Sequence, residues 1–345
     1  MTEGPHVWVV RAGKGGKNAA DFQEKGLVAI GFAPIADVSR KSREQIFDYA
    51  RELIGSKAGN VAGQIHRFAN AIQIGDLVAV PDGQNRELLY GTVTGGYEYR
   101  DVPVIEGTQW RHVRAVDWHG RRNRDDLPDR ILFSLGSLLT VFEPAYQAAL
   151  AAFLTSGEAP DDSGEGAAAS AADDTATGPT SAAEQEARNR ELIAKKIAAL
   201  GWSETQDFVA GVLGALGYGT EVAGAGADGG IDILACRDPL FLHPPVVKVQ
   251  VKAKPTTKIG PDEIRQLNGL VDSGSERGIF VATGGFTRPA EKEAAQMKVQ
   301  LWNLERLAEL FIENYDELDD ETQALVPLRR IWVLDDPEDR PGDVE

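Results

Sequence analysis

The sequence predicts an α/β protein built from two domains. Its 345 residues are enough for two domains of ordinary size. Alternating Val-rich segments and amphipathic segments occur both before residue 157 and after residue 186, which is typical of mixed α/β folds. Residues 157–186 contain eight acids, no base and no aromatic residue, so they cannot bury enough apolar surface to fold. We therefore expect domains at 1–156 and 187–325, an acidic flexible linker at 157–186, and a short strand with an acidic tail at 326–345.

The net charge of −17 is unevenly distributed along the chain. Residues 1–156 carry 18 basic and 18 acidic side chains, and residues 187–312 carry 15 of each. The excess acid lies in the linker and in residues 313–345, which hold three bases and twelve acids. Both expected domains are thus close to neutral, so the overall acidity does not exclude a nucleic acid as partner.

The composition excludes several other classes of protein. A single cysteine, Cys236, rules out an internal disulfide and a cysteine-based zinc cluster. The five histidines have no metal-ligand spacing, and we expect His112 and His119 to be exposed strand or loop residues. No apolar run reaches membrane-spanning length, and the first residues do not have the layout of a signal peptide. A cytoplasmic location is therefore expected.

The first domain is expected to be a small curled sheet or barrel flanked by helices. Ser42 is a helix cap before an amphipathic segment that reaches residue 55, and a second helix is expected over 60–72. The Gly- and Lys-rich segment 11–18 lacks the spacing of a nucleotide-binding P-loop, so we expect a flexible loop there that can contact the backbone of a nucleic acid. Alternating apolar residues between turn residues predict strands over 6–13, 26–32, 77–80, 87–100 and 110–121.

The second domain contains a strand with one apolar and one polar face. Between residues 247 and 254, the side chains of Lys248, Gln250, Lys252 and Lys254 alternate with apolar ones. Unpaired lysines on an internal strand are costly unless something anionic compensates them. The polar row therefore indicates an anionic partner, and the alternative is an edge strand with solvated lysines.

Asp232 supplies an acid close to this row. It lies between Ile231 and Ile233, and we expect it to project away from both isoleucines toward the polar side chains. An acid, an amide oxygen and an ammonium group on adjacent strands suit a hard divalent cation beside a phosphodiester. The pattern therefore predicts a metal-assisted site at Asp232.

Asp232, the sequence Gln250-Val251-Lys252 and the preceding GADGGID resemble the Mrr-type catalytic domain of the PD-(D/E)xK nuclease superfamily, in its QxK variant. The resemblance covers about residues 187–312. It implies a restriction-endonuclease-like α/β fold with a central mixed sheet, and hydrolysis of DNA phosphodiester bonds with Mg²⁺, for which Mn²⁺ can substitute. Asp232 and Gln250 would be the metal ligands, and Lys252 would orient water or offset charge on the phosphorus. Further segments that resemble this family's helices and strands are 204–218, 258–271, 277–296 and 300–311.

The first helix of this nuclease domain departs from the family pattern. That helix often carries a Glu that supports the metal site, whereas the corresponding position here is Gln206, with Glu204 as an acidic neighbour. Because Gln206 and Gln250 are neutral, Asp232 is the one certain anionic ligand. We therefore expect either weak metal affinity or a DNA phosphate that supplies the missing charge. The DNA contacts expected around the site are Lys248, Lys254, Lys258 and Arg265.

The first domain resembles the PUA-like superfamily, especially its EVE-type modules. The resemblance rests on WVVRAG, GLVAIGF, IGDLVAV, LYGTVTGGYEY and HVRAVDW in that order. It implies a mixed β-barrel and α domain whose aromatic pocket accepts a flipped modified base, such as a modified cytosine. Arg100, Arg111 and Arg114 are candidates to hold phosphates, although a solvated strand face is an equal alternative. The candidate pocket walls are Trp8, Phe32, Tyr99 and Trp118, of which Tyr99 and Trp118 are the preferred pair.

Together the two resemblances imply a modification-dependent, type IV-like restriction endonuclease of host defence against phage. Its partner would be double-stranded DNA that carries a modified base. Cutting both strands needs two sites, so a homodimer or a transient dimer on DNA is expected. Two alternatives stay open: a catalytically inactive nuclease-fold module that only binds DNA, and an RNA-directed nuclease.

Overall fold

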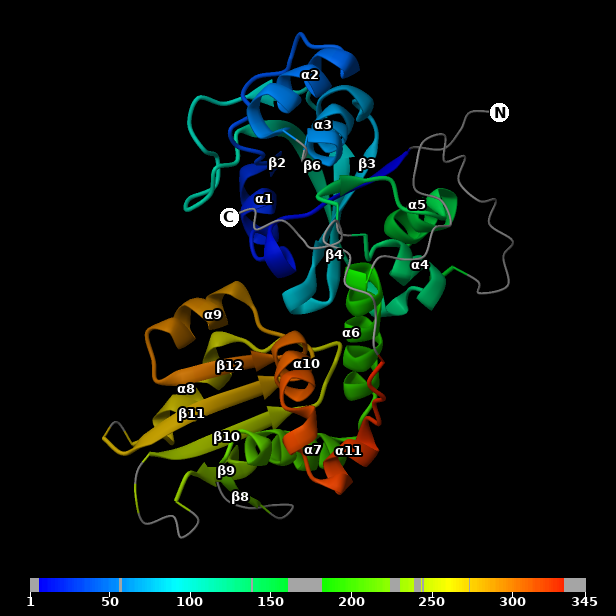
Figure 1. Ribbon diagram of the computed structural model, residues 1–345. Helices are drawn as coiled ribbons and strands as arrows, with labels where there is room; N and C mark the ends of the chain where they lie inside the picture. Colours follow the sequence, from blue (N-terminus) through cyan, green and yellow to red (C-terminus); the bar gives the residue numbers. More distant parts are fainter. Residues whose placement is uncertain are drawn as a thin grey trace. The chain divides into compact units, whose positions relative to one another are not determined.

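The computed structural model describes residues 6–55, 58–137, 139–160, 182–223, 230–238, 243, 245–272 and 274–331. These residues form two compact units, the first within residues 6–185 and the second within residues 186–331 (Figure 1). Each unit has a mixed sheet flanked by helices, so the expected α/β class is confirmed. No helix among the described residues combines the length and the apolar character that crossing a membrane requires.

The first unit is built on a mixed seven-stranded sheet with the order β2-β6-β4-β3-β1-β7, and β5 pairs with β6. β1 and β3 are parallel, and the other pairs are antiparallel. The long strand β6 pairs first with β2 and then with β4, where the register shifts between Tyr90 and Gly91. Such a change of partner and such a bulge increase the curl of a sheet. The strands are β1 (Val7–Val10), β2 (Leu27–Ile30), β3 (Leu77–Asp82), β4 (Glu87–Val93), β5 (Glu98–Tyr99), β6 (His112–Asn123) and β7 (Val141–Phe142).

Both faces of strand β1 are buried. On β1, Trp8 and Val10 belong to one apolar cluster, whereas Val7 and Val9 belong to another. This period of two explains why the strand is apolar throughout, since each face packs against its own layer of helices. The helices are α1 (Ala19–Lys25), α2 (Arg43–Ile54), α3 (Ala58–His66) with a π-helical turn (Arg67–Ala71), α4 (Asp129–Ser134) and α5 (Gln147–Ser156).

The expected strands and the two expected helices of this unit are present, and Ser42 caps α2 through its side chain. Four elements were not expected, namely α1, α4, β7 and α5. The first three are seven, six and two residues long, too short for a periodic pattern to be read. Helix α5 is apolar on most of its surface, so it has no amphipathic stripe that would mark it.

The second unit has a five-stranded sheet with the order β12-β11-β10-β9-β8. The pairs β10–β11 and β11–β12 are parallel, and the pairs β8–β9 and β9–β10 are antiparallel, so β10 is the central strand. The strands are β8 (Gly219–Val222), β9 (Ile233–Cys236), β10 (Val246–Lys252), β11 (Glu276–Ala282) and β12 (Val299–Asn303). The helices are α6 (Ala182–Ala198), α7 (Trp202–Ala215), α8 (Pro261–Gly269), α9 (Arg288–Ala295), α10 (Leu304–Glu313) and α11 (Asp320–Leu325).

Some expectations for the ends of the second domain were wrong or fall outside the described residues. Helix α6 begins at Ala182, five residues before residue 187, where the second domain was expected to begin. Residues 326–331 form no strand, and the rest of the expected strand and tail lies outside the described residues. The expected linker also lies mostly outside them, since residues 161–181 are not described.

Candidate active site

The polar row of the second unit lies on the central strand. Along β10, Val247, Val249 and Val251 are buried in one apolar cluster with residues of α7 and α10. The alternating Lys248, Gln250 and Lys252 are half-buried and belong to the opposite face. The expected two-faced strand is confirmed.

Asp232 lies immediately before β9, beside the middle of β10. Its backbone N–H donates to the carbonyl of Val249 at 2.8 Å. The expectation that Ile231 and Ile233 share a face is wrong, because Ile233 is in the α7 cluster and Ile231 packs against the cluster formed by α8 and α9. The strand begins only at Ile233, so the period of two does not extend back to Ile231.

Both oxygens of the Asp232 carboxylate accept a hydrogen bond from the protein. Gln206 donates from Nε2 to Oδ1 at 2.7 Å, and the backbone N–H of Val251 donates to Oδ2 at 2.7 Å. Gln206 lies on α7 and is only 3% exposed. Glu204 points elsewhere, since its Oε2 accepts the N–H of Gly201 at 2.8 Å and caps the same helix. Gln206 is therefore the helix residue that supports Asp232.

Burial and the neighbouring polar groups shift the pKa of Asp232 in opposite directions. Burial is the largest effect and raises the pKa of Asp232 above its ordinary value, while the Val251 N–H, the Lys252 ammonium and the Gln206 amide act to lower it. Burial outweighs these three groups, because desolvation disfavours the charged form of a carboxyl. A positive partner would stabilise the charged form of this half-buried carboxylate.

Gln250 and Lys252 complete this cluster. A Cβ atom on Gly230 would lie 3.2 Å from Gln250 Nε2, and the φ of Gly230 is +90°, so glycine leaves room for the amide. The backbone N–H of Thr283 donates to the carbonyl of Lys252 at 3.1 Å and fixes the end of β10 against β11. Thr283 was not expected near the site, although it directly follows β11, a buried strand parallel to β10, and the ends of parallel strands meet at one edge of a sheet.

The four expected DNA contacts differ in their surroundings. Lys248 is 2.7 Å from Glu276 Oε2 and donates to the carbonyl of Leu270 at 2.7 Å, so its compensating anion is part of the protein. It also lies at the start of β10, about 13 Å along the strand from Lys252. Lys254 is exposed, Lys258 is half-buried, and Arg265 is exposed and pairs with Asp262 and Glu293.

Three of the four expected walls of a base pocket, Trp8, Phe32 and Trp118, pack in or against one apolar cluster of the first unit. Trp8 is 3% exposed and donates from Nε1 to Asp76 Oδ2 at 2.9 Å, and Phe32 is buried in the same apolar cluster. Tyr99 pairs with His112, whereas Trp118 lies six residues further along β6, about 20 Å by strand rise. Tyr99 and Trp118 both lie near turns in the sequence, but this does not indicate how far apart the strand register places them.

Two polar residues of β6 are buried rather than exposed. His112 is 1% exposed, with Nδ1 2.8 Å from the Tyr97 hydroxyl and Nε2 3.3 Å from the carbonyl of Ile35. Burial is the main cause that lowers the pKa of His112 to about 4. The expected exposure is wrong for His112, whereas His119 is exposed as expected.

Arg114 is 4% exposed and donates to the carbonyls of Phe68 (2.6 Å), Ala69 (2.8 Å) and Gly95 (3.3 Å). Its guanidinium therefore satisfies backbone groups, two of them in the π-helical turn, and the expectation that it holds a phosphate is wrong. Arg111 donates to the carbonyl of Asp101, and Arg100 pairs with Glu98 on the surface.

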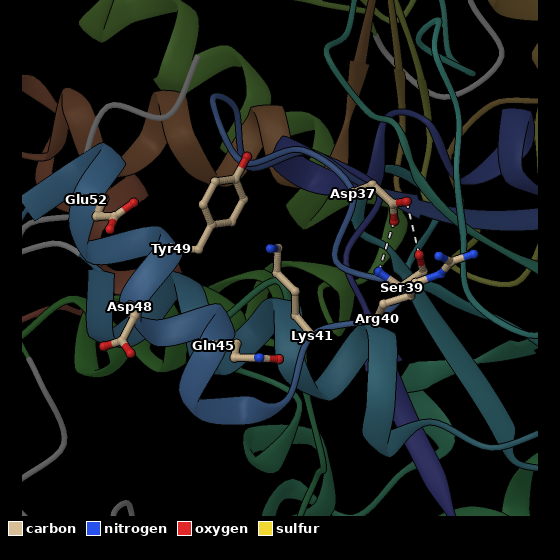
Figure 2. A pocket seen from close by; sticks show the side chains of 8 residues that line it. All are labelled: Asp37, Ser39, Arg40, Lys41, Gln45, Asp48, Tyr49 and Glu52. Atoms are coloured by element: carbon tan, nitrogen blue, oxygen red, sulfur yellow. Dashed lines mark hydrogen bonds between the residues drawn. The ribbon is translucent and has the colours of Figure 1, made fainter.

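A pocket of about 600 Å³ lies between α2 and the segment before it (Figure 2). Tyr49 is its one aromatic lining residue, and the ammonium of Lys41 lies 4.8 Å over that ring. A flipped base needs flat walls on two sides, so this pocket does not replace the expected one. Its lining residues are Asp37, Ser39, Arg40, Lys41, Gln45, Asp48, Tyr49 and Glu52.

Two family models match the chain. Residues 197–311 match the Mrr catalytic family, described as restriction endonuclease, and residues 8–136 match a family described as a domain of unknown function. Residues 197–311 of the second unit are therefore similar to a restriction-endonuclease domain of the Mrr type. Each match covers less than half of the chain, and the PUA-like assignment of the first domain stays a prediction.

One curated relative has a similar sequence over part of its length. The type IV methyl-directed restriction enzyme EcoKMrr of Escherichia coli (strain K12) is 37% identical over 121 residues. The alignment covers 32% of this chain and 38% of the relative, so the chain matches well under half of that enzyme's length.

Two solved structures give weaker likenesses. The restriction endonuclease MspJI in complex with a 27-mer oligonucleotide has 14% identity and a TM-score of 0.30, over 87% of this chain and 73% of that chain. The DNA modification-dependent restriction endonuclease AspBHI has 16% identity and a TM-score of 0.31, over 86% and 77%. These scores are too low to support an argument about this chain.

Proposed function

We propose that this chain is a modification-dependent restriction endonuclease that hydrolyses DNA phosphodiester bonds. The observation that carries the proposal is the cluster of Asp232, Gln206, Gln250 and Lys252, where α7 meets the central strand of an Mrr-type domain. Recognition would lie in residues 1–156 and cleavage in residues 187–325.

The residues around Asp232 fit a hard divalent cation such as Mg²⁺ or Mn²⁺. Such ions prefer oxygen ligands, and this cluster offers one half-buried carboxylate and the amide oxygens of Gln250 and Gln206. The described residues contain no group of three or more His, Cys, Asp or Glu side chains that could hold a metal, so the charge of the site is low. A phosphate of the substrate would supply further negative charge, and metal affinity would then rise when DNA binds.

Each residue of the cluster has a role in hydrolysis. A bound Mg²⁺ would supply Lewis acidity and lower the pKa of a water molecule. Asp232 and Gln250 would hold the ion, and Gln206 would fix the orientation of Asp232. Lys252 would stabilise the charge that develops when water adds to phosphorus, a P–O bond to one sugar breaks, and a proton passes to the leaving oxygen.

The first unit would provide recognition of a modified base in double-stranded DNA. The support for this assignment is the order of strand motifs that resembles PUA-like domains, and no pocket residues are assigned. Each chain offers one Asp232 site, so cutting of both strands would need a homodimer or a transient dimer on DNA.

Plasmid cleavage by the full chain and by Lys252→Ala tests this function. Unmodified, 5-methylcytosine and 5-hydroxymethylcytosine plasmids would be incubated with Mg²⁺, with Lys292→Ala as control because Lys292 is an exposed cation on α9. We expect cutting of a modified plasmid alone, a loss of at least about 10²-fold in Lys252→Ala, and full activity of the control. Cutting of every plasmid would remove the reader assignment and keep the nuclease.

A DNA-binding module without catalysis is the second candidate. The observation in its favour is that both Asp232 oxygens already accept protein hydrogen bonds and that Gln206 and Gln250 are neutral. This candidate predicts DNA binding that does not depend on Mg²⁺ and that occurs without nicking.

A further inference from the structure

The Gly- and Lys-rich segment between β1 and α1 is a compact turn rather than the expected flexible loop. Gly13, Gly15 and Gly16 have φ angles of +80°, +63° and +74°, which L side chains rarely adopt. A Cβ atom on Gly16 would lie 2.2 Å from the carbonyl oxygen of Pro81, so the turn is packed directly on the end of β3. The shape of residues 12–18 is therefore fixed by their neighbours.

This turn presents hydrogen-bond donors that have no acceptors. Lys14 and Lys17 are exposed, and neither ammonium has an acidic partner among the described residues. The backbone N–H groups of Lys14 and Gly15 likewise have no acceptor in the part of the chain that the structure describes. The Nδ2 atom of Asn18 is buried, lies beside Gly13 and has no hydrogen-bond partner there either.

Asp82, the acid next to the point where the turn packs on β3, does not neutralise the turn. Asp82 follows Pro81 on β3, but its carboxylate is occupied by Arg121 at 2.5 Å and by Asn85 at 3.1 Å. It is also 5% exposed, so it cannot reach the lysine ammonium groups across the surface. Two ammonium groups, two backbone N–H groups and a buried amide therefore stay uncompensated on one rigid turn.

We propose that residues 13–18 bind phosphate groups of a DNA backbone. A site with donors and no acceptor selects an anion, and a backbone turn with adjacent N–H groups can hold a phosphate oxygen. Lys14 and Lys17 would neutralise phosphates and position the first unit on the duplex, independently of base sequence. This inference rests on the proposed function, because it takes DNA as the substrate.

The salt dependence of DNA binding tests the proposal. Binding of the full chain to a 30-base-pair duplex, with a metal chelator present to prevent cleavage, would be measured by fluorescence anisotropy between 50 and 200 mM salt. Lys14→Gln/Lys17→Gln should weaken binding by roughly tenfold and make the slope of log affinity against log salt less negative by about 1.8, or about 0.9 per lost phosphate contact. Lys14→Arg/Lys17→Arg should keep the slope.

Arg51→Gln is the matched control, because Arg51 is an exposed cation on α2 of the same unit and has no partner among the described residues. It should bind like the unchanged protein. An unchanged slope in the double glutamine variant would overturn the phosphate site and leave the nuclease intact, whereas absent DNA affinity in the unchanged protein would overturn both. Lysine-dependent binding of ATP without any change in the DNA slope would overturn the assignment to DNA in favour of a free nucleotide.

Discussion

Arg114 in the first unit and Asp232 in the second are charged side chains on or beside a sheet, but their partners differ in kind. Arg114 is 4% exposed and donates to three backbone carbonyls, two of which belong to the π-helical turn after α3. Carbonyls at the end of a helix have no partner within it, so the guanidinium completes the fold. Asp232 is half-buried and accepts from one backbone N–H and one side-chain amide.

The difference shows how a structural charge can be told from a reactive one. The partners of Arg114 are backbone groups that cannot leave without unfolding the turn. One partner of Asp232 is the Gln206 side chain, whose amide can rotate and present its oxygen instead of its nitrogen. The ammonium of Lys252 also lies close enough to affect the pKa of Asp232. Asp232 can therefore exchange a partner while the fold stays intact, and four experiments follow from this contrast.

The largest effect is expected for Asp232→Asn. Loss of the carboxylate should lower cleavage by about 10³-fold or more, because the site would lose its proposed anionic metal ligand. Stability should change by less than about 1 kcal/mol, since the new amide can still accept from Val251 while Gln206 reverses to accept from it. Plasmid cleavage and urea unfolding measure the two quantities. If Asp232→Asn lowers the stability of the protein strongly as well as its activity, then Asp232 has a structural role like that of Arg114.

Arg114→Met should have its main effect on stability and not on the site at Asp232. Removal of the guanidinium leaves three carbonyls without a donor, and the first unit should lose about 3 kcal/mol of stability. Arg111→Met is the control, because Arg111 directly precedes β6, is half-buried and donates to a surface carbonyl. Its loss should stay below about 1 kcal/mol. Equal effects in the two variants, measured by urea unfolding, would contradict the structural role of Arg114.

How far the sequence could lead follows from the same two residues. The alternation on β10 and the D…QxK spacing are local patterns, so Asp232, Gln250 and Lys252 could be found before the fold was known. The burial of Arg114 could not, because it depends on which carbonyls a distant helix leaves unpaired. The separation of Tyr99 from Trp118 depends on strand register in the same way, and sequence distance to a turn does not encode it.

The buried His112 should make the stability of the first unit depend on pH. Burial lowers its pKa from 6.5 to about 4, so between these values the unfolded chain binds more protons than the folded one. The first unit should therefore lose up to about 3 kcal/mol as the pH falls from 6.5 to 4. Hydrogen exchange of the β4 amides would resolve this unit from the second. His112→Gln should flatten the dependence, whereas His119→Gln, at an exposed position, should leave it unchanged.

The smallest effect is expected for Gln206→Glu, which tests whether the partner of Asp232 is exchangeable. A second carboxylate at this place should tighten Mn²⁺ binding by about tenfold, or about 1.4 kcal/mol, because ligand charge sets affinity for hard cations. Without metal, two carboxylates at hydrogen-bond distance repel, so the metal-free variant should melt at a lower temperature than the unchanged protein. Added Mn²⁺ should therefore raise its melting temperature more than it raises that of the unchanged protein.

Glu204→Gln is the matched control on the same helix, since Glu204 caps α7 and does not contact Asp232. Isothermal titration calorimetry with Mn²⁺ should give this control the affinity of the unchanged protein. If Gln206→Glu binds Mn²⁺ no more tightly than the control does, then the Gln206 amide only holds Asp232 in place. Asp232 would in that case resemble Arg114, whose partners cannot be exchanged. A gain confined to Gln206→Glu would instead show that the side chain on α7 reaches the ion, and that the neutral amide keeps metal affinity low until DNA supplies the missing charge.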